Sequence, residues 1–340
     1  MDRLSSAFAS GEIVSDLNHF TLDFEKPVRD LEIQIKELKE ASARPELDIS
    51  REIKALEKKV NTLIQEIYEN LSPWERVQLS RHPNRPHAVD FIADLIEDFH
   101  EVKGDRRFAN DPAVIAGFGY FGKQRVAIVG IEKGRKTKEK VHHNFGMPRP
   151  EGYRKALRVM KMAGSFGIPI ITFVDTPGAY PGIGAEERGQ SQAIAENLAE
   201  LFDVQSPIIS LVVGEGGSGG ALGIAIADRV LMMEYSIYSV ISPESCASIL
   251  WADPKKAETA ANALQLGPDK AVELKVADGI VPEPPGGAHK DQKRAMELVR
   301  KSLEKELKDL LKLPTKALLD ARFKKFREMG NQTIIEIKES

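Results

Sequence analysis

Two glycine-rich loops, each lying between a strand-like and a helical segment, constrain the fold of this chain most. The first loop runs from Asp175 to Gly182 after the apolar segment 168–174, and the second runs from Gly214 to Gly220 after the apolar segment 207–213. A third strand-like segment, 229–233, follows another helical pattern. Strands that alternate with helices predict a largely parallel sheet with helices on both faces. The expected fold class is therefore α/β.

The segments before the first loop fit the same architecture. Two segments rich in valine, isoleucine and phenylalanine, 113–121 and 124–132, flank Gly122-Lys123 and predict a β-hairpin. A helical pattern from Pro150 to Phe166 leads into the first apolar strand, and a second helix is expected from about Glu186 to Phe202.

Helical patterns also mark both ends of the chain. Between residues 27 and 71, apolar residues recur every three or four positions in two series separated by Ala43-Arg44-Pro45, which predicts a helical hairpin. Because each arm is short, we expect its apolar stripe to pack on a partner or on the body of the protein, a solvated antiparallel hairpin being the alternative. Residues 292–329 predict an amphipathic helix with a solvated face. These patterns divide the chain into an N-terminal segment with the helical hairpin, 1–75, a core, 76–288, and a C-terminal amphipathic tail, 289–340.

Charge and cysteine content exclude several classes of protein. With 48 basic and 51 acidic residues the formal net charge is −3, so binding to nucleic acid through phosphate contacts is not expected. The single cysteine, Cys246, can form neither an internal disulfide nor a cysteine-based zinc site, and no metal is expected on this chain. The N-terminus lacks the apolar core of a signal peptide, so we expect a cytoplasmic protein. The apolar stretch 207–227 contains Glu215 and repeated glycines, and it predicts a strand, a loop and a helix rather than a membrane span.

Two interpretations of the glycine loops concern nucleotides. Asp175-Thr176-Pro177-Gly178 is similar to the DxxG switch of a GTPase, but the chain lacks the GxxxxGK[ST] loop that this chemistry needs. Gly214, Gly216 and Gly219 form a GxGxxG pattern between a strand and a helix. Glu234 lies twenty residues further on, where an acid that binds ribose would be expected. A dinucleotide-dependent oxidoreductase is therefore an alternative.

Two further interpretations concern acyl chemistry. The segment 216–220 (GGSGG) fits the GxSxG nucleophile elbow around Ser218, for which the only downstream histidine is His289. Alternatively, the loops form an oxyanion hole, because glycines at the start of a helix present unpaired amides and the positive end of the helix dipole to a substrate oxygen. The simplest alternative is that both loops are only tight turns.

Five motifs around these loops resemble one protein family. They are NFGMPRPEGYRKA (144–156), FVDTPGAYPG (173–182), EERGQ (186–190), GEGGSGGA (214–221) and YSVISPE (238–244). Their sequence and order are similar to those of the carboxyltransferase alpha subunits of bacterial acetyl-CoA carboxylase, and the resemblance extends from Leu22 to Val281.

The resemblance implies a crotonase-like (ClpP/crotonase) fold for the core, which is a spiral of ββα units. It implies transfer of a carboxyl group from carboxybiotin, tethered to a biotin carboxyl carrier protein, to acetyl-CoA, which gives malonyl-CoA for fatty-acid synthesis. The family acts as an α2β2 complex with a beta subunit of the same fold, and with biotin carboxylase in the ATP-dependent holoenzyme. The beta subunit carries a four-cysteine zinc ribbon, so zinc is expected only there, and the chain alone should be inactive.

The resemblance also assigns site residues. The biotin oxyanion hole is assigned to the amides of Gly219 and Gly220, with Gly178 on the facing loop and Gly216 and Gly217 as second choices. Removing one donor of this kind typically reduces transition-state stabilisation by on the order of 3 to 4 kcal/mol.

A basic stretch from Lys133 to Arg149 is a candidate for binding CoA phosphates or the acidic carrier. The substrate-binding candidates in it are Arg135, Lys136, Lys138 and Arg149. His142 and His143 stand where arginines are common in the family, and a mobile solvated loop is the alternative.

Overall fold

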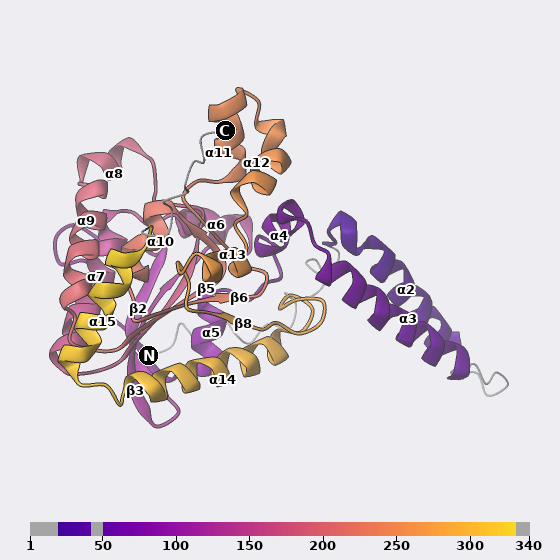
Figure 1. Ribbon diagram of the computed structural model, residues 1–340, viewed down its shortest axis with the longest axis horizontal. Coiled ribbons are helices and arrows are strands. Elements are labelled where there is room, and N and C mark those ends of the chain that lie inside the picture. The colour runs from indigo at the N-terminus through magenta and orange to yellow at the C-terminus, as the bar shows by residue number, and fades with distance from the viewer. Residues whose placement is uncertain (1–19, 42–49, 331–340) are drawn as a thin grey trace, which may run out of the picture.

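A mixed sheet forms the centre of the computed structural model, which describes residues 20–41 and 50–330 (Figure 1). Within these residues the strand order is β1-β2-β3-β4-β5-β6-β8, and β7 pairs with β5. The strands are β1 (Glu97–Glu101), β2 (Val114–Phe121), β3 (Gln124–Ile131), β4 (Ile170–Thr176), β5 (Ile208–Gly217), β6 (Arg229–Met233), β7 (Ile237–Ser239) and β8 (Gly279–Val281). The first three are antiparallel neighbours and the others run parallel, so the predicted hairpin and the largely parallel sheet are confirmed.

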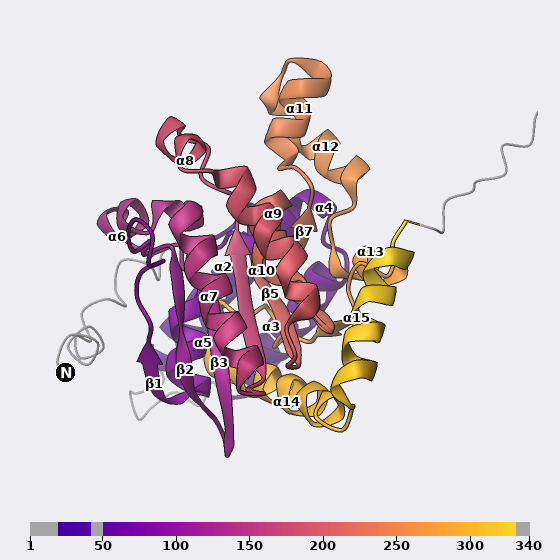
Figure 2. The ribbon, with the colours of Figure 1, turned by 90° about the vertical axis from the view of Figure 1, so that its left-hand side faces the viewer.

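Helices lie on both faces of the sheet (Figure 2). They are α2 (Lys26–Ala41), α3 (Ser50–Glu69), α4 (Pro73–Ser80), α5 (Ala88–Leu95), α6 (Thr137–His142), α7 (Pro150–Ser165), α8 (Ile183–Glu187), α9 (Gln190–Glu200), α10 (Ser218–Ala225), α11 (Pro243–Trp251), α12 (Ala257–Leu264), α13 (Pro268–Glu273), α14 (Gln292–Leu310) and α15 (Thr315–Glu328). Short 3-10 turns occur at η1 (Asp23–Glu25), η2 (Asn144–Gly146), η3 (Leu201–Asp203) and η4 (Pro254–Lys256).

The central strands explain this two-sided arrangement, because every residue of β4 and β5 is buried. Ile170 and Val174 of β4 pack on one face with α7 and α10. Ile171 and Phe173 point to the other face and pack with α5 and α14. Alternate side chains of one strand therefore belong to two separate apolar cores.

The apolar stretch 207–227 forms β5 and α10, as predicted. In the part of the chain that the structure describes, no helix is sufficiently long and apolar to cross a membrane.

The predicted helical hairpin is present as α2 and α3, and it projects from the body of the protein (Figure 1). Residues 43–45, expected between its arms, lie outside the described residues. The two apolar stripes pack on each other through residues such as Ile35 and Val60, since an antiparallel pair of similar stripes can bury both. The alternative, an antiparallel hairpin whose arms pack on each other, is therefore the arrangement found, and the expectation that the stripes pack on the body is wrong along most of the hairpin. Contact with the body is made at the base, where the rings of Tyr68 and Tyr235 lie 5.4 Å apart.

The helix expected from Glu186 to Phe202 is interrupted. α8 ends at Glu187 and α9 begins at Gln190, because Gly189 between them takes a left-handed conformation with φ of 80°. The interruption separates α8, which projects beyond the first glycine loop, from α9, which packs against α7 and α10.

The C-terminal tail forms two helices, α14 and α15, which are separated at Pro314. The apolar residues of α14, including Leu303 and Leu307, are buried against the sheet, and Leu318 of α15 joins the same core. The predicted amphipathic character is therefore confirmed, and the apolar face of α14 packs on the body of the protein. Arg322 of α15 is completely buried and forms two bonds of 2.9 and 2.7 Å to the Asp228 carboxylate. The same guanidinium donates to three backbone carbonyls. It therefore fixes α15 to the start of β6.

Replacing Arg322 by methionine should lower the free energy of unfolding by about 3 to 5 kcal/mol, because Asp228 would keep a buried charge without its partner. Urea denaturation followed by circular dichroism measures this change. Arg327→Met, on an exposed position of the same helix, is the matched control and should change the value by less than about 0.5 kcal/mol. Equal unfolding midpoints for the two variants would contradict this role of Arg322.

Candidate active site

The two glycine loops meet at the carboxyl ends of β4 and β5. A Cβ atom added to Gly220 would lie 2.5 Å from the carbonyl carbon of Gly178, and one added to Gly217 would lie 2.3 Å from the Pro177 oxygen. No side chain fits at such separations, so the loops pack backbone against backbone. The two glycine loops of the sequence therefore lie in direct contact.

The second loop turns directly from a strand into a helix and leaves amides available at the turn. β5 ends at Gly217, and α10 begins at Ser218, whose φ of 49° is uncommon for residues other than glycine. No side chain of the described residues caps α10, and the first amides of a helix have no carbonyl one turn earlier. A Cβ atom on Gly219 would meet only Ile194, at 3.8 Å, so the space beside Gly219 is open. This helix start can donate hydrogen bonds to an oxygen that carries negative charge.

The other glycines of the predicted site differ from those at the helix start. Gly178 has open space beside its Cα, but its amide donates to Thr176 Oγ1 at 3.0 Å. Gly216 and Gly217 lie inside β5 and pair with residues of β7. The amides at the start of α10 are therefore the most available ones.

The geometry gives no support to the GxGxxG interpretation. Gly214 and Gly216 lie within β5, so the strand passes through the positions where a phosphate-binding turn would begin. The Glu234 carboxylate accepts a hydrogen bond from the Glu283 amide at 2.8 Å. His289, the base that a nucleophile elbow would need, is bonded to a glutamate of the N-terminal segment.

A network of charged side chains lies beneath the loops, and the sequence patterns did not predict it. Lys133 Nζ lies 2.7 Å from Asp175 Oδ1 and 3.0 Å from Glu215 Oε2. Arg81 Nε donates to Glu215 Oε1 at 2.6 Å, and the other end of its guanidinium pairs with Glu244 of α11. The one available signal is that an acidic residue, Asp175 or Glu215, stands in the first two positions of each glycine loop.

Lys133 and Glu215 stay charged in this environment. Burial would lower the pKa of Lys133, but the charges of Asp175 and Glu215 outweigh burial and raise that pKa. Burial would raise the pKa of Glu215, but Lys133 and Arg81 outweigh burial and lower it. Opposite charges therefore join the ends of β3, β4 and β5.

The basic stretch lies at the same end of the sheet, on and around α6 (Figure 1). The guanidinium of Arg149 lies over the ring of Tyr180 in the first loop, 4.7 Å from its centroid. Arg135 is paired with an aspartate of α5, whereas Lys136 and Lys138 are exposed at the start of α6. Of the four substrate-binding candidates, Arg149 is therefore the one whose side chain lies against a residue of a glycine loop.

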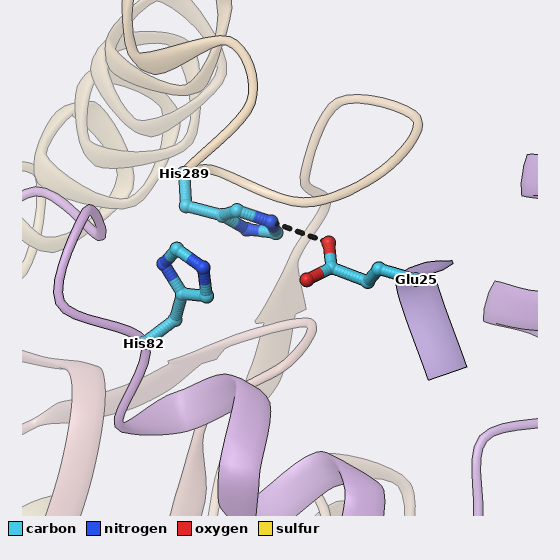
Figure 3. A group of neighbouring side chains, drawn as sticks. All are labelled: Glu25, His82 and His289. Atoms are coloured by element: carbon cyan, nitrogen blue, oxygen red, sulfur yellow. Dashed lines mark hydrogen bonds and ion pairs between the residues drawn. The ribbon is translucent and has the colours of Figure 1, made fainter. Parts of the chain in front are cut away.

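Among the described residues, Glu25, His82 and His289 bring three possible metal ligands within 4.8 Å of one another (Figure 3). The Nδ1 atom of His82 accepts a hydrogen bond from the Asn84 amide at 3.1 Å, so its Nε2 carries the ring proton and cannot coordinate a metal. His289 Nε2 lies 2.8 Å from Glu25 Oε1, which also accepts from the Tyr68 hydroxyl at 2.8 Å. The group is therefore a hydrogen-bonded junction between the hairpin base and the body.

The protonation states of this junction agree with that assignment. Burial lowers the pKa of His82 to about 3, so its ring is neutral at physiological pH. Burial would raise the pKa of Glu25, but the hydrogen bond and charge of His289 outweigh it and lower the pKa to about 2. Glu25 is thus a charged acceptor for the groups around it.

Comparison with known proteins gives a consistent result. The family profile described as acetyl co-enzyme A carboxylase carboxyltransferase-like matches residues 21–330. Three relatives are named acetyl-coenzyme A carboxylase carboxyl transferase subunit alpha. The protein from Methylococcus capsulatus is 52% identical over 309 residues, which cover 91% of this chain and 96% of the relative. The proteins from Thermus thermophilus and Syntrophotalea carbinolica are 51% and 55% identical, each over 91% of this chain and 98% of the relative.

Solved structures agree in fold. The transcarboxylase 12S structure with methylmalonyl-coenzyme A bound aligns with a TM-score of 0.51 at 22% identity, over 65% of this chain and 41% of that chain. The Pseudomonas malonate decarboxylase hetero-tetramer in complex with coenzyme A aligns with a TM-score of 0.52 at 16% identity, over 64% of this chain and 86% of that chain. The predicted crotonase-like fold is confirmed.

Gly220→Ala should destabilise the protein by about 1 to 3 kcal/mol, because its methyl group would overlap the backbone of the first loop. Gly219→Ala is the matched control, since its methyl group enters open space and alanine favours a helix by up to about 1 kcal/mol. Thermal unfolding of the two variants measures the difference. Similar melting temperatures would contradict the close contact between the loops.

Proposed function

The chain belongs to the family of acetyl-CoA carboxylase carboxyltransferase alpha subunits, and on this premise we propose that it supplies backbone amides that stabilise negative charge during carboxyl transfer to acetyl-CoA. Members of this family are carboxyltransferases with the crotonase-like fold, which act in multi-subunit assemblies with biotin-carrying partners. Their reaction gives malonyl-CoA for fatty-acid synthesis. The oxidoreductase alternative has no support from the relatives or from the course of β5.

The observation that carries the proposal is the uncapped start of α10 beside the open space at Gly219. Bound carboxybiotin, carried by a separate protein, supplies the carboxyl group that is transferred. The amides of Gly219 and Gly220 donate to an oxygen that gains negative charge during the transfer. Because these donors belong to the backbone of a turn between a buried strand and a helix, they need no reorganisation when that charge develops.

The neighbouring glycines shape this site. Gly178 forms the facing wall, and its amide is engaged within its own loop. Gly216 and Gly217 remain the second choice as donors, and their small size is needed in any case. A Cβ atom on Gly216 would lie 2.6 Å from the ring of Tyr238.

The beta subunit completes the enzyme in this proposal, as an α2β2 complex in which zinc is held by the beta chain. Exposed apolar side chains around the glycine loops support a protein partner there. They include Ile183 at the start of α8, Val240 after β7, and Ile249 and Leu250 at the end of α11. Ile183 is 80% exposed and Val240 76%, which is unfavourable for side chains that face water permanently. The biotin carboxyl carrier protein would then bring its biotin to the boundary between the subunits.

The exposed lysines of α6 are proposed to attract the phosphates of CoA or the acidic carrier. Lys136 and Lys138 both lie in the first residues of this helix region, at the end of the sheet that carries the glycine loops. Arg135 and Arg149 contribute less to this attraction, because the first is paired with Asp90 and the second lies over an aromatic ring.

The purified chain mixed with its beta subunit should transfer a carboxyl group between biotin and malonyl-CoA, whereas either chain alone should not. In this complex Gly219→Val should lower kcat by about 100-fold to 1,000-fold, because its side chain would block access to the amides. Size-exclusion chromatography verifies that the variant still assembles, and Gly219→Ala serves as the smaller control. Unchanged turnover of an assembled Gly219→Val complex would refute the assignment of the donors.

The double variant Lys136→Ala with Lys138→Ala should raise the KM for malonyl-CoA or for the carrier about threefold, since exposed charges of this kind contribute up to about 1 kcal/mol. The increase should shrink at high salt, and kcat should not change. Steady-state kinetics at two ionic strengths measures both effects. An unchanged KM for both substrates would assign these lysines to a solvated surface only.

A further inference from the structure

The charged network beneath the glycine loops has a geometry that the proposed function does not by itself require. Its central group is the ammonium of Lys133, which follows β3 and contacts one carboxylate on each of the next two strands. We propose that Lys133 is a positioning residue for carboxyl transfer, whose ammonium sets the spacing between the two glycine loops by holding Asp175 and Glu215 together. This inference rests on the proposed function of the amides at the start of α10.

The contacts form a short path from Lys133 to the proposed donors. Asp175 Oδ1 accepts both the Lys133 ammonium and the backbone amide of Glu215, at 2.7 and 2.9 Å. Asp175 stands three residues before Gly178, and Glu215 stands four residues before Gly219. Beyond these positions the loops touch backbone to backbone. A change in the separation of the two carboxylates therefore changes the position of the donors.

Lys133 is also required electrostatically. Without its ammonium, the carboxylates of Asp175 and Glu215 would face each other as like charges in a buried site, a situation in which one carboxylate takes up a proton. Arg81 balances part of the charge of Glu215, but Glu244 shares its guanidinium.

The other charged and titratable groups nearby cannot replace Lys133. A small cavity of about 60 Å³ brings Asp175, Lys133 and Arg81 together with further basic groups, namely His82, Arg85, His87, Arg135 and Lys140. Arg85 is bonded through both ends of its guanidinium to Glu283, and His87 is bonded to Glu132. Arg135 is paired with Asp90, and neither the neutral His82 nor Lys140 forms a bond to Asp175 or Glu215 in the described residues.

Lys133 is unsuited to a direct role in substrate binding. Its side chain is only 17% exposed, and its ammonium forms two short bonds inside the protein. A substrate anion would have to displace a carboxylate in order to reach it.

The test is steady-state kinetics of the complex with the beta subunit, with Lys133→Met in place of the natural chain. We expect kcat to fall about a hundredfold, because small displacements of catalytic groups have effects of this size, and KM for malonyl-CoA to stay within about twofold. The kcat of the variant, relative to the natural complex, should rise as pH is lowered from about 8 to about 6, because protonation of a carboxylate relieves the repulsion.

Lys133→Arg keeps the charge but changes the geometry, so it should lower kcat about tenfold with the natural pH profile.

Lys325→Met is the matched control, because Lys325 is also 17% exposed and also pairs with an aspartate, Asp278, at 2.7 Å. It lies at the opposite end of the sheet, near the start of β6, and should lower thermal stability without changing the pH dependence of kcat. A Lys133→Met complex with natural kcat, or with the pH profile of the control, would overturn the inference. If Lys133→Met does not assemble, natural kcat in Lys133→Arg would overturn it equally. Inactivity of the natural complex would instead refute the proposed function.

Discussion

The backbone contact between the loops that follow β4 and β5 is the constraint on which the rest of the structure depends. Gly217 and Gly220 allow the second loop to lie directly against the first, since no side chain fits between them. For this contact to form, the two strands must end at the same level. Their register is continuous from Ile170 opposite Ile208 to Val174 opposite Val212, and it then shifts so that Thr176 pairs with Gly216. α10 must also begin immediately after β5, and this exposes its first amides beside the contact.

Buried ion pairs attach the surrounding elements to this centre. Lys133 connects the ends of three strands, and Arg85 is bonded to Glu283 and to a carbonyl of β5. Arg322 attaches the last helix at the opposite end of the sheet. A charge buried without its partner is strongly destabilising, so each pair restricts its element to one position. The junction around Glu25 in Figure 3 does the same for the base of the hairpin.

A site built from backbone donors has consequences for the whole chain. Ser218 needs no role as a nucleophile, and its unusual φ follows from the sharp turn between strand and helix. Backbone donors can stabilise charge but cannot enclose a large substrate by themselves, which agrees with a family that acts in multi-subunit assemblies. The exposed apolar side chains of α8 and α11, on either side of the loops, are where we expect that second surface to lie.

The amino-acid sequence determined the local elements and the family. Periodic apolar residues gave the hairpin arms, the strands and most helices, because burial of one face requires that spacing, and the glycine motifs located the loops. The sequence did not determine which stripes would face each other: it left the packing of α2 on α3 as one of two alternatives, and the burial of α14 on the sheet was not predicted. The interruption at Gly189 and the contacts of Lys133 were also decided by the tertiary structure. The spacing of apolar residues shows only which side of a single segment is buried. Lys133, Asp175 and Glu215 lie far apart in the sequence, and they become neighbours only when the pairing of β3, β4 and β5 brings the ends of these strands together.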